Sequence, residues 1–464
     1  MALSRIWAAF ILISIAMAAI KYSFAPGYKG IFSEMVVGKS GDTVRMPPAL
    51  PPAGNPLPMS PATAVSSAGT PDSLAYAASA YRIQKADGIL DTCKTAVNLS
   101  INLIGIMALF MGFINIAERA GGVNLLARIV GPFFSKLFPE VPKGHPAMGH
   151  MVMNFSANLL GLDNAATPFA LKAMESLQTI NPEKDRASNT QIMFLCLHAS
   201  GLQLIPISII AIRAASKAPD PTDVFIPIVI ATFIATLAAL VIVSIRQKIN
   251  LFQPVIMLWI GGFSALIALV VIYLHGLDAH DVQAFSGVLA NGLILLIFLL
   301  IISGALYKKI NIFEAFVEGA KGGFETAVRI IPYLVGMLAA ISLLRNSGAF
   351  DIVIDGISHL FHALGADTRF VEGLPTALIK PLSAAGARGM MVDTMAAHGA
   401  NSFAGRLSCI LQGSSDTTFY IVAVYFGAVS IRNTRYSIGA MLLADLVGIL
   451  ASIFLCYLFF GHSA

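Results

Sequence analysis

The chain has 464 residues, of which 56% are hydrophobic and only 12% are charged. Soluble domains carry roughly 25% charged residues, so this composition excludes a soluble multidomain enzyme and indicates a membrane protein. The net charge of +5 is small and spread along the chain, without the basic run that nucleic-acid binding needs, so we expect no nucleic-acid partner.

Apolar stretches recur along the whole chain. A transmembrane helix needs ~17–25 largely apolar residues, and most of the stretches reach that length. They predict an all-α, polytopic integral membrane protein in the lipid bilayer of the cell (inner) membrane. The stretches are Ile6–Ile20, Leu99–Asn115, Gln191–Ile212, Val224–Ser244, Leu251–Leu274, Phe285–Leu306, Ile330–Leu344, Leu407–Ile431 and Ile438–Phe460.

The N-terminal part contains one short apolar stretch and one linker. Ile6–Ile20 follows Arg5, so a cleaved signal peptide competes with a retained span, which we favour because no clear cleavage site follows. Residues 40–84 form the linker, in which Pro47–Pro61 is rich in Pro, Ala and Gly. Proline fixes φ and removes a donor, so we expect extended or disordered chain there.

Basic residues beside the spans predict the orientation. Lys and Arg favour cytoplasmic connections. One short connection carries Arg246 and Lys248 and another carries Lys308 and Lys309, whereas His275–Gln283 between them has neither residue type. We therefore expect a cytoplasmic N-terminus, an external linker and an external C-terminus.

An internal repeat divides the chain. Thr95–Val97 recurs as Thr326–Val328, and a Gly-containing connection follows each copy's first span, at Gly121 and at Gly348. A polar stripe accompanies each copy, with a spacing that predicts a helix lying along the membrane surface before the span. The stripes are Asp87, Lys94 and Asn98 in the first copy and Glu318, Glu325 and Arg329 in the second.

The two copies are predicted to be inverted relative to each other. An odd number of crossings separates them if the segment near 147–173 is a re-entrant hairpin. Inverted repeats with broken helices are typical of secondary transporters. The predicted division is 1–39 for the N-terminal span and flank, 40–84 for the linker, 85–215 for the first repeat, 216–310 for connecting spans and 311–464 for the second repeat.

Polar residues interrupt the apolar pattern in the first repeat. Met151–Leu171 contains breakers at Gly161 and Pro168, which free backbone groups that only protein or water can satisfy. We interpret this segment as part of a solute or ion site; a packed hairpin with interhelical hydrogen bonds is the alternative. The candidate substrate-binding residues are Asn154, Asn158, Asp163, Asn164 and Thr167.

The second repeat has two matching polar segments. Lys380–Gly389 is broken by Pro and Gly and supplies Ser383 and Arg388, and the run 412–418 lies inside an apolar stretch. Asp416 is the only charge in Leu407–Ile431, and we expect Lys380 or Arg388, or a transported ion, to be its partner. The candidates in this run are Gln412, Ser414, Ser415, Asp416 and Thr417, with Ser200 and His198 in the corresponding run of the first repeat.

His198 is more typical of a packing residue than of a proton carrier. No enzyme, metal or cofactor signature is present. His145 and His150 lack the HExxH pattern, Gly319–Gly322 lacks the P-loop spacing, and Cys93, Cys196, Cys409 and Cys456 are far apart. We therefore predict that the chain is not an enzyme and that it binds no metal and no cofactor.

These segments resemble the spore maturation proteins A and B joined end to end. The A-like half is Met1 to about Ala215, with His145–Pro168 as its most telling stretch; the B-like half starts at about Val224 and carries Phe316–Phe324 and Gln412–Tyr420. The resemblance implies membership in the nucleoside-recognition (Gate) superfamily, which includes concentrative nucleoside transporters and ferrous-iron transporters. It also implies a context of spore core dehydration and maturation.

Two functions follow as hypotheses. The first is a permease that moves a small polar or anionic solute, with or without a coupling ion, through a site at the repeat interface. The alternative is a non-transporting membrane scaffold, or spore-maturation factor, that acts through a partner. A homo-oligomer is compatible with both, and the solute, the direction and the coupling ion stay open.

Overall fold

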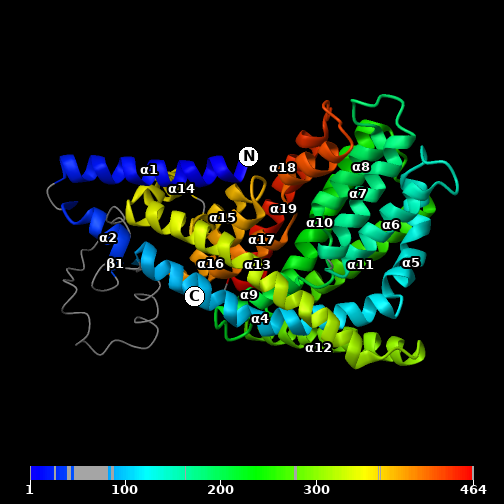
Figure 1. The fold of residues 1–464 in the computed structure, drawn as a ribbon, viewed down its shortest axis with the longest axis horizontal. Helices are drawn as coiled ribbons and strands as arrows, with labels where there is room; N and C mark the ends of the chain where they lie inside the picture. The colour runs from blue at the N-terminus through cyan, green and yellow to red at the C-terminus, as the bar shows by residue number, and fades with distance from the viewer. Residues whose placement is uncertain are drawn as a thin grey trace.

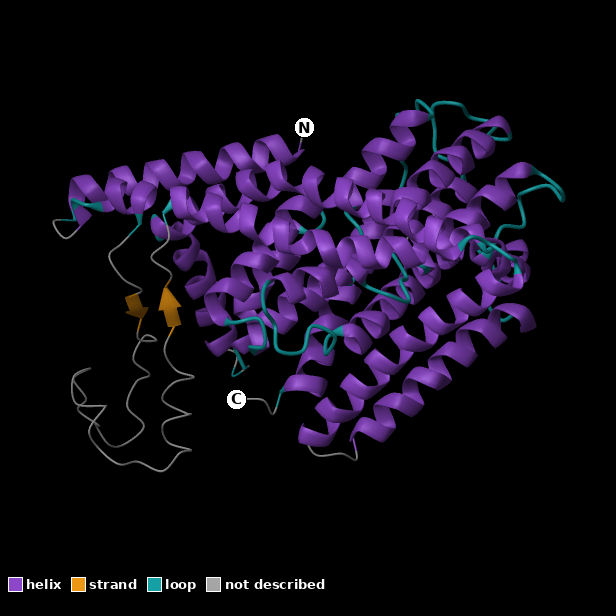
Figure 2. Ribbon diagram, turned by 60° about the horizontal axis from the view of Figure 1, so that its bottom comes forward, coloured by secondary structure: helices purple, strands orange, loops and turns teal. Residues whose placement is uncertain are grey.

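The computed structural model describes residues 2–25, 28–38, 43–45, 82–84, 88–161, 163–275, 279–363, 365 and 367–461. Helices form almost all of this part of the chain (Figure 1). Of the predicted linker only β1 (Thr43–Arg45) and β2 (Arg82–Gln84) are described. They pair in an antiparallel ladder to one side of the helices (Figure 2).

The helices fall into two series of corresponding elements. The N-terminal α1 (Ala2–Phe24) and α2 (Ile31–Val37) precede the first series, and α11 (Pro254–His275) and α12 (Ala279–Tyr307) separate the two. The first series is α4 (Ile89–Arg119), α5 (Gly122–Leu137), α6 (Pro146–Leu159), α7 (Asp163–Thr179), α8 (Asn189–Ser200), α9 (Ile207–Ala215) and α10 (Phe225–Gln247). The second is α13 (Ile312–Asn346), α14 (Ala349–Ala363), η2 (Arg369–Gly373) with α15 (Leu374–Ile379), α16 (Ala384–His398), α17 (Phe403–Gly413), α18 (Thr418–Ile421) with η3 (Val422–Phe426), and α19 (Ser437–Phe460).

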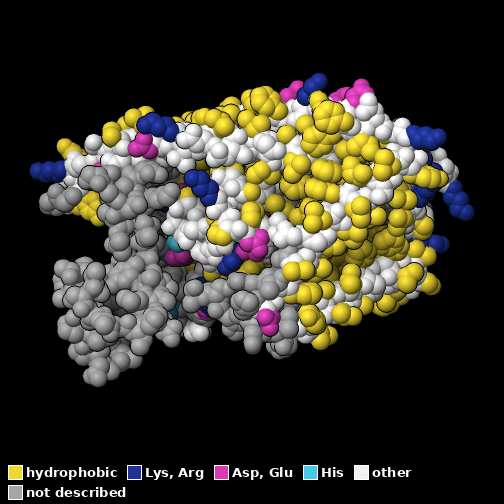
Figure 3. All heavy atoms as spheres, turned by 90° about the horizontal axis from the view of Figure 1, so that it is seen from below, with side chains coloured by type: hydrophobic (Ala, Val, Ile, Leu, Met, Phe, Trp, Pro, Cys, Tyr) yellow, Lys and Arg dark blue, Asp and Glu magenta, His cyan; other side chains and the backbone are white. Residues whose placement is uncertain are grey.

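Most of the predicted membrane helices are present. Among the described residues, six helices are long and apolar enough to cross a bilayer, and each overlaps a predicted stretch. Ile330–Leu344 lies within α13, whose shorter apolar part is Leu334–Asn346. Large hydrophobic side chains stay exposed on α11 and α12, and Figure 3 shows a broad hydrophobic area on this side of the molecule. The chain is therefore a multi-pass α-helical membrane protein.

The first helices of the two series run antiparallel, side by side (Figure 1). A Cβ built on Gly323 would lie 2.6 Å from the Met107 carbonyl oxygen, whereas one on Gly319 would lie 2.5 Å from the Asn115 Cβ. As residue numbers rise along α4, the facing numbers fall along α13. Asn115 Nδ2 donates to the Ala315 carbonyl at 2.7 Å, which continues the same register.

The last helices of the two series are antiparallel as well. Gln247 near the end of α10 donates to the Tyr436 hydroxyl just before α19, at 2.8 Å. Further along, a Cβ on Gly448 would lie 3.2 Å from the Ala235 Cβ. Because corresponding helices run in opposite directions in both pairs, the repeats are inverted, and in this correspondence α10 belongs with the first repeat.

One prediction about the repeats was wrong. The described residues of the polar stripes do not form separate surface helices, because α4 and α13 are continuous over 31 and 35 residues. Asp87 of the first stripe lies outside the described residues. At 1.5 Å per residue, α4 is about 46 Å long, which exceeds the ~30 Å hydrocarbon core. No proline interrupts Ile89–Arg119, so nothing in the sequence ends the helix between stripe and span; the turns come afterwards, at Gly121 and Gly348, with φ values of 83° and 74°.

Two large clusters make up most of the hydrophobic core of the described residues. One lies among α4, α9, α13, α16 and α17, and the other among α5, α6, α7 and α8; α10 and α19 contribute to both. This antiparallel pair therefore joins the two clusters.

We predict that the close approach of α4 and α13 depends on Gly323. In Gly323→Ala the new Cβ meets backbone atoms of Met107 and Ala108 at 2.6–2.7 Å, so overpacking should cost about 1–3 kcal/mol. Gly322→Ala is the matched control: a Cβ there meets nothing within 4 Å, and alanine is the better helix former by ~1 kcal/mol. Thermal unfolding in detergent should separate the two variants, and equal melting temperatures would contradict this packing.

Candidate functional site

Two helices are interrupted at matching places. α8 ends at Ser200 and α9 begins at Ile207, whereas α17 ends at Gly413 and α18 begins at Thr418. We call residues 201–206 the first break and residues 414–417 the second break. Each lies inside a stretch that the sequence predicted as one continuous span. The breaks free backbone N–H and C=O groups, which a lipid environment cannot satisfy.

The second break bonds to the end of α8. The N–H of Asp416 donates to the carbonyl of Ala199 at 2.7 Å. Gly201 suits the turn that makes this contact, since its φ of 59° lies in the left-handed region that favours glycine. The backbone therefore joins the two repeats where both lose their helical structure.

A helical hairpin closes on each break. The predicted hairpin of the first repeat is present as α6 and α7, and α15 and α16 occupy the corresponding place in the second. Leu204 donates to the Leu159 carbonyl at 2.8 Å, and Phe419 donates to the Pro381 carbonyl at 3.0 Å. These two bonds satisfy freed backbone groups in the same way in both repeats.

The polar cluster of the first repeat is uncharged. His198 Nδ1 lies 3.1 Å from Asn154 Oδ1 and 3.0 Å from Asn158 Nδ2. This nitrogen carries at most one hydrogen, so it donates to one amide or accepts from the other, and one contact goes unmade. Tyr425 of the second repeat stands edge-on to the His198 ring, with centroids 5.0 Å apart. His198 thus has the bonded, packed environment that the sequence favoured.

The polar cluster of the second repeat is charged. The Lys380 ammonium is buried and donates to the Gln412 carbonyl at the end of α17. Lys380 and Arg388 are the cations whose charges act on Asp416; that either is its direct partner stays a prediction. Ser383 has a different role, because its hydroxyl accepts from the Gly386 N–H at 3.0 Å and caps α16.

A second buried carboxylate, Asp445 on α19, escaped the sequence analysis. Thr418 Oγ1 donates to Asp445 Oδ2 at 2.6 Å, and the Ser415 hydroxyl bonds to the same side chain. Asp445 is 4% exposed and is the only charged residue of Ser437–Phe460. The argument applied to Asp416, a single charge within a span, would have found it.

Two polar oxygens at the second break lack partners. Within the described part of the chain, Gln412 Oε1 and Thr417 Oγ1 are buried without a hydrogen bond. A buried polar atom of this kind needs a water or a ligand to offset its desolvation. Ser414, by contrast, donates to the Leu411 carbonyl at 2.9 Å.

The other predicted substrate-binding residues give little further evidence for a binding site. Ser200 is buried and donates to the Leu197 carbonyl at 2.8 Å, and Thr167 is half-buried on α7. Asp163 and Asn164 open α7, and their side chains lie outside what the structure describes. The structure therefore brings together the candidates of the second break, and separately Asn154 and Asn158.

Five cations of the second repeat lie in a stretch that the predicted topology places outside the cell, whereas Lys and Arg favour the cytoplasmic side. They are Arg345, Arg369, Lys380, Arg388 and Arg406. Arg406 bonds to Asp223, Arg345 bonds to Asp393, and Arg369 bonds to Asp367 at 2.8 Å. Lys380 and Arg388 belong to the charged cluster described above, so all five have interactions within the protein.

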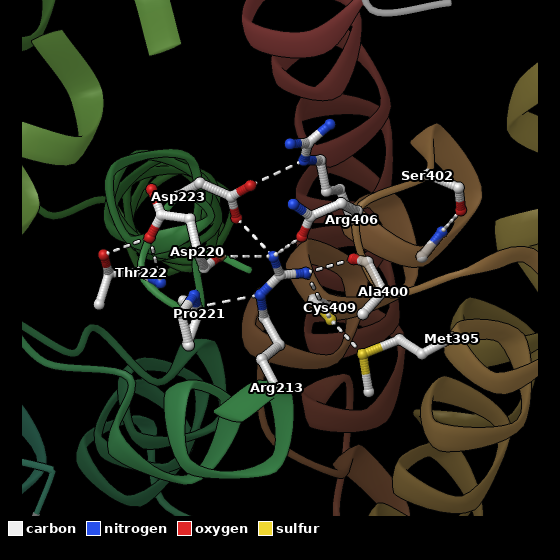
Figure 4. A network of polar contacts seen from close by, with 12 residues as sticks. Arg213, Asp220, Pro221, Thr222, Asp223, Met395, Ala400, Ser402, Arg406 and Cys409 are labelled. Carbon is white, nitrogen blue, oxygen red and sulfur yellow. Dashed lines mark hydrogen bonds and ion pairs between the residues drawn. The ribbon is translucent and has the colours of Figure 1, made fainter. Parts of the chain in front are cut away.

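An arginine–aspartate cluster, formed by Arg213, Asp223 and Arg406, joins the repeats at one end (Figure 4). Arg213 is completely buried, and its guanidinium donates to Asp223 at 2.7 Å and to the Ala400 carbonyl at 2.7 Å. Arg406 donates to the other Asp223 oxygen at 2.8 Å and lies over the Phe460 ring. Sequence reasoning missed this cluster, because Arg406 lies 183 positions from Asp223 along the chain.

Backbone bonds join the repeats at the opposite end. The Ala187 N–H donates to the Asn433 carbonyl at 2.9 Å, and the Arg432 N–H donates to the Asp185 carbonyl at 2.9 Å. The basic residues Lys184, Arg186, Arg246, Lys248, Arg432 and Arg435 are close together in these loops and at the adjoining helix ends.

The breaks and hairpins lie in regions that this chain shares with known proteins. A family model described as "Nucleoside recognition" matches residues 100–216 and 327–432, which contain both breaks and both hairpins. Spore maturation protein B of Bacillus subtilis is 46% identical over 177 residues, covering 37% of this chain and 98% of the relative. Spore maturation protein A of the same organism is 38% identical over 156 residues, covering 34% of this chain and 80% of the relative. No solved structure matches the chain.

We predict that Asp223→Asn destabilises the protein by about 3–5 kcal/mol, since it leaves two buried guanidinium groups without their shared carboxylate. Asp220→Asn is the control, because the Asp220 carbonyl keeps its bond to Arg213 and the amide oxygen can still accept from Thr222. The midpoint of thermal aggregation in detergent measures the difference. Equal midpoints for the two variants would assign no stabilising role to the cluster.

Proposed function

Because the chain belongs to the nucleoside-recognition (Gate) family of membrane proteins and is similar to both spore maturation proteins A and B, we propose that it is a permease. It moves a small polar or anionic solute across the membrane through a site formed by its two breaks. Each repeat contributes one break and one hairpin, so a single chain holds the complete site.

The bond between Asp416 and Ala199 is the observation that carries this proposal. A membrane helix that serves only as a structural span needs no interruption, and an interruption is tolerated only beside protein or a water-filled path. Here the two interruptions adjoin each other at the interface of inverted repeats, where secondary transporters bind their solutes.

The side chains around the breaks suit a polar solute. Asn154 and Asn158 offer amide groups, Gln412 and Thr417 offer buried oxygens without partners, and Lys380 supplies a positive charge. In a low-dielectric site such groups select a solute by the hydrogen bonds it can complete, because an incomplete set leaves buried polar atoms unpaired.

The end that carries the backbone bonds is proposed to face the cytoplasm. The basic residues gathered there follow the positive-inside trend. A single cysteine introduced as Lys248→Cys should react with a membrane-impermeant thiol reagent only after cells are permeabilised. Reaction in intact cells would reverse the orientation.

Solute flux in proteoliposomes tests the proposed function. Vesicles containing the purified chain are incubated with a small-molecule cell extract, and their contents are identified by mass spectrometry. The permease should accumulate or exchange at least one component above the level of protein-free vesicles. Absence of any flux would instead support the scaffold alternative.

We predict that Asp416→Asn abolishes this flux at normal membrane abundance. The variant keeps the backbone N–H that bonds to Ala199 and removes only the charge. An aspartate in a span costs ~2.5–3.5 kcal/mol on insertion scales, more than the ~0.6–2 kcal/mol of an interhelical hydrogen bond, which argues against a purely packing role. Glu175→Gln, at an exposed position of α7, should transport normally. Full flux in the Asp416→Asn variant would make Asp416 a packing residue.

A further inference from the structure

Asp445 is the buried charge that the proposed solute site does not use. It lies on α19, where the Thr418 hydroxyl at the start of α18 donates to its carboxylate at 2.6 Å and the Ser415 hydroxyl of the second break interacts with the same group. These bonds fasten the break to a helix that is otherwise apolar. A purely structural anchor of this kind needs no charge, since an asparagine oxygen accepts the same hydroxyl hydrogens.

The surrounding charges distinguish Asp445 from Asp416. Lys380 and Arg388 both act on Asp416, whereas of these two cations Lys380 acts on Asp445, which also has the Thr418 and Ser415 hydroxyls as partners and Asp416 as a neighbouring acid. Cys196 on α8 also faces Asp445. The two buried carboxylates therefore have different sets of partners.

The helices α10, α12 and α17 also pack against α19, but their charged residues lie away from Asp445. Along α10 the only charged residue is Arg246, near the end beside Tyr436, and along α17 it is Arg406, in the arginine–aspartate cluster. On α12 the charged and titratable residues lie at the helix ends. The groups that act on Asp445 are Lys380, Asp416 and Cys196, together with the two hydroxyls. The packed helices α8 and α18 also carry the titratable residues His198 and Tyr420.

A metal cation fits this cluster poorly. The Lys380 ammonium lies in the same cluster and repels a second cation, and the Thr418 hydroxyl already directs its hydrogen at Asp445. Among the described residues no group of three or more acidic, histidine or cysteine side chains is arranged to hold a metal. A proton needs only one carboxylate oxygen.

We propose that Asp445 is a proton-binding residue that couples solute movement to proton movement, an inference that rests on the proposed transport function. A proton from water on one side of the membrane binds a carboxylate oxygen and gives the neutral acid. Its release to water on the other side restores the carboxylate, so no other bond is made or broken.

The hydrogen bonds from Thr418 and Ser415 link the protonation state of Asp445 to the position of the second break. The ionised carboxylate accepts from both Thr418 and Ser415, whereas the protonated acid has one oxygen that donates and retains less accepting capacity. Protonation therefore weakens the attachment of Ser415 and Thr418 to α19. Ser415 lies in the second break and Thr418 directly follows it, so the position of the break depends on the proton.

Infrared difference spectra test proton binding without a known solute. The full chain in lipid is compared between mildly acidic and mildly alkaline buffer, and the carbonyl stretch of a protonated carboxyl group is recorded. We expect a pH-dependent band that is lost in Asp445→Asn and retained in Asp416→Asn. Thr418→Val, which removes the 2.6 Å bond, should shift the band without abolishing it. A spectrum unchanged by Asp445→Asn would overturn the inference.

Transport supplies the second arm. In the proteoliposome assay an imposed pH gradient should drive accumulation of the transported component, and Asp445→Asn should lose this response while solute exchange persists. Ser452→Ala, at a buried hydroxyl of the same helix, is the control. Flux that ignores the gradient would refute coupling but leave the permease intact. With no flux at all, the infrared arm alone decides whether Asp445 binds a proton.

Discussion

The structure depends on one constraint: backbone groups that leave a helix inside a membrane must bond to something other than lipid. Each repeat interrupts one helix, and the freed groups find partners in the hairpin of the same repeat and in the other repeat. The Asp416 N–H bonds to Ala199, Leu204 bonds to Leu159, and Phe419 bonds to Pro381. The inverted arrangement allows this, because it brings the end of α8 against the break after α17.

Inversion gives the repeats the same backbone geometry but different chemistry. The first repeat places two amides around His198, whereas the second places Lys380 near Asp416 and Asp445. The outer contacts differ as well, since arginine side chains join the repeats at one end and backbone bonds join them at the other. A site with a neutral half and a charged half is suited to binding a polar solute and an ion separately. The cluster of Arg213, Asp223 and Arg406 would have to part for that end to open.

Much of the fold could be predicted from the sequence, because apolar length and small breaker residues act locally. The six long helices, the hairpin around Gly161 and the paired connections at Gly121 and Gly348 all follow from such signals. Hydropathy does not report helix continuity, however. Gln191–Ile212 and Leu407–Ile431 were expected as continuous spans although both are interrupted, and the surface helices expected before α4 and α13 are parts of those helices.

The site was predicted only in part, for a physical reason. Asp416 stood out as a single charge in an apolar run, and its cationic neighbours come from the adjacent hairpin. Arg213 donates a hydrogen bond to the Ala400 carbonyl, which lies 187 positions away along the chain. No local sequence pattern predicts that contact. Asp445, like Asp416, is a single charge within an apolar stretch. It lies outside any polar segment, so a prediction based on polar motifs does not find it.

Thiol accessibility tests the central claim that the two breaks line one path for polar solutes. Single cysteines are introduced as Ser200→Cys and Ser415→Cys in a chain whose native cysteines are replaced by alanine, with Ser452→Cys as a control inside α19. The account predicts that a small water-soluble thiol reagent modifies both break positions, although both are buried in this conformation, and leaves the control unmodified. Protection of both break positions under conditions that modify an exposed cysteine at Lys94 would contradict it.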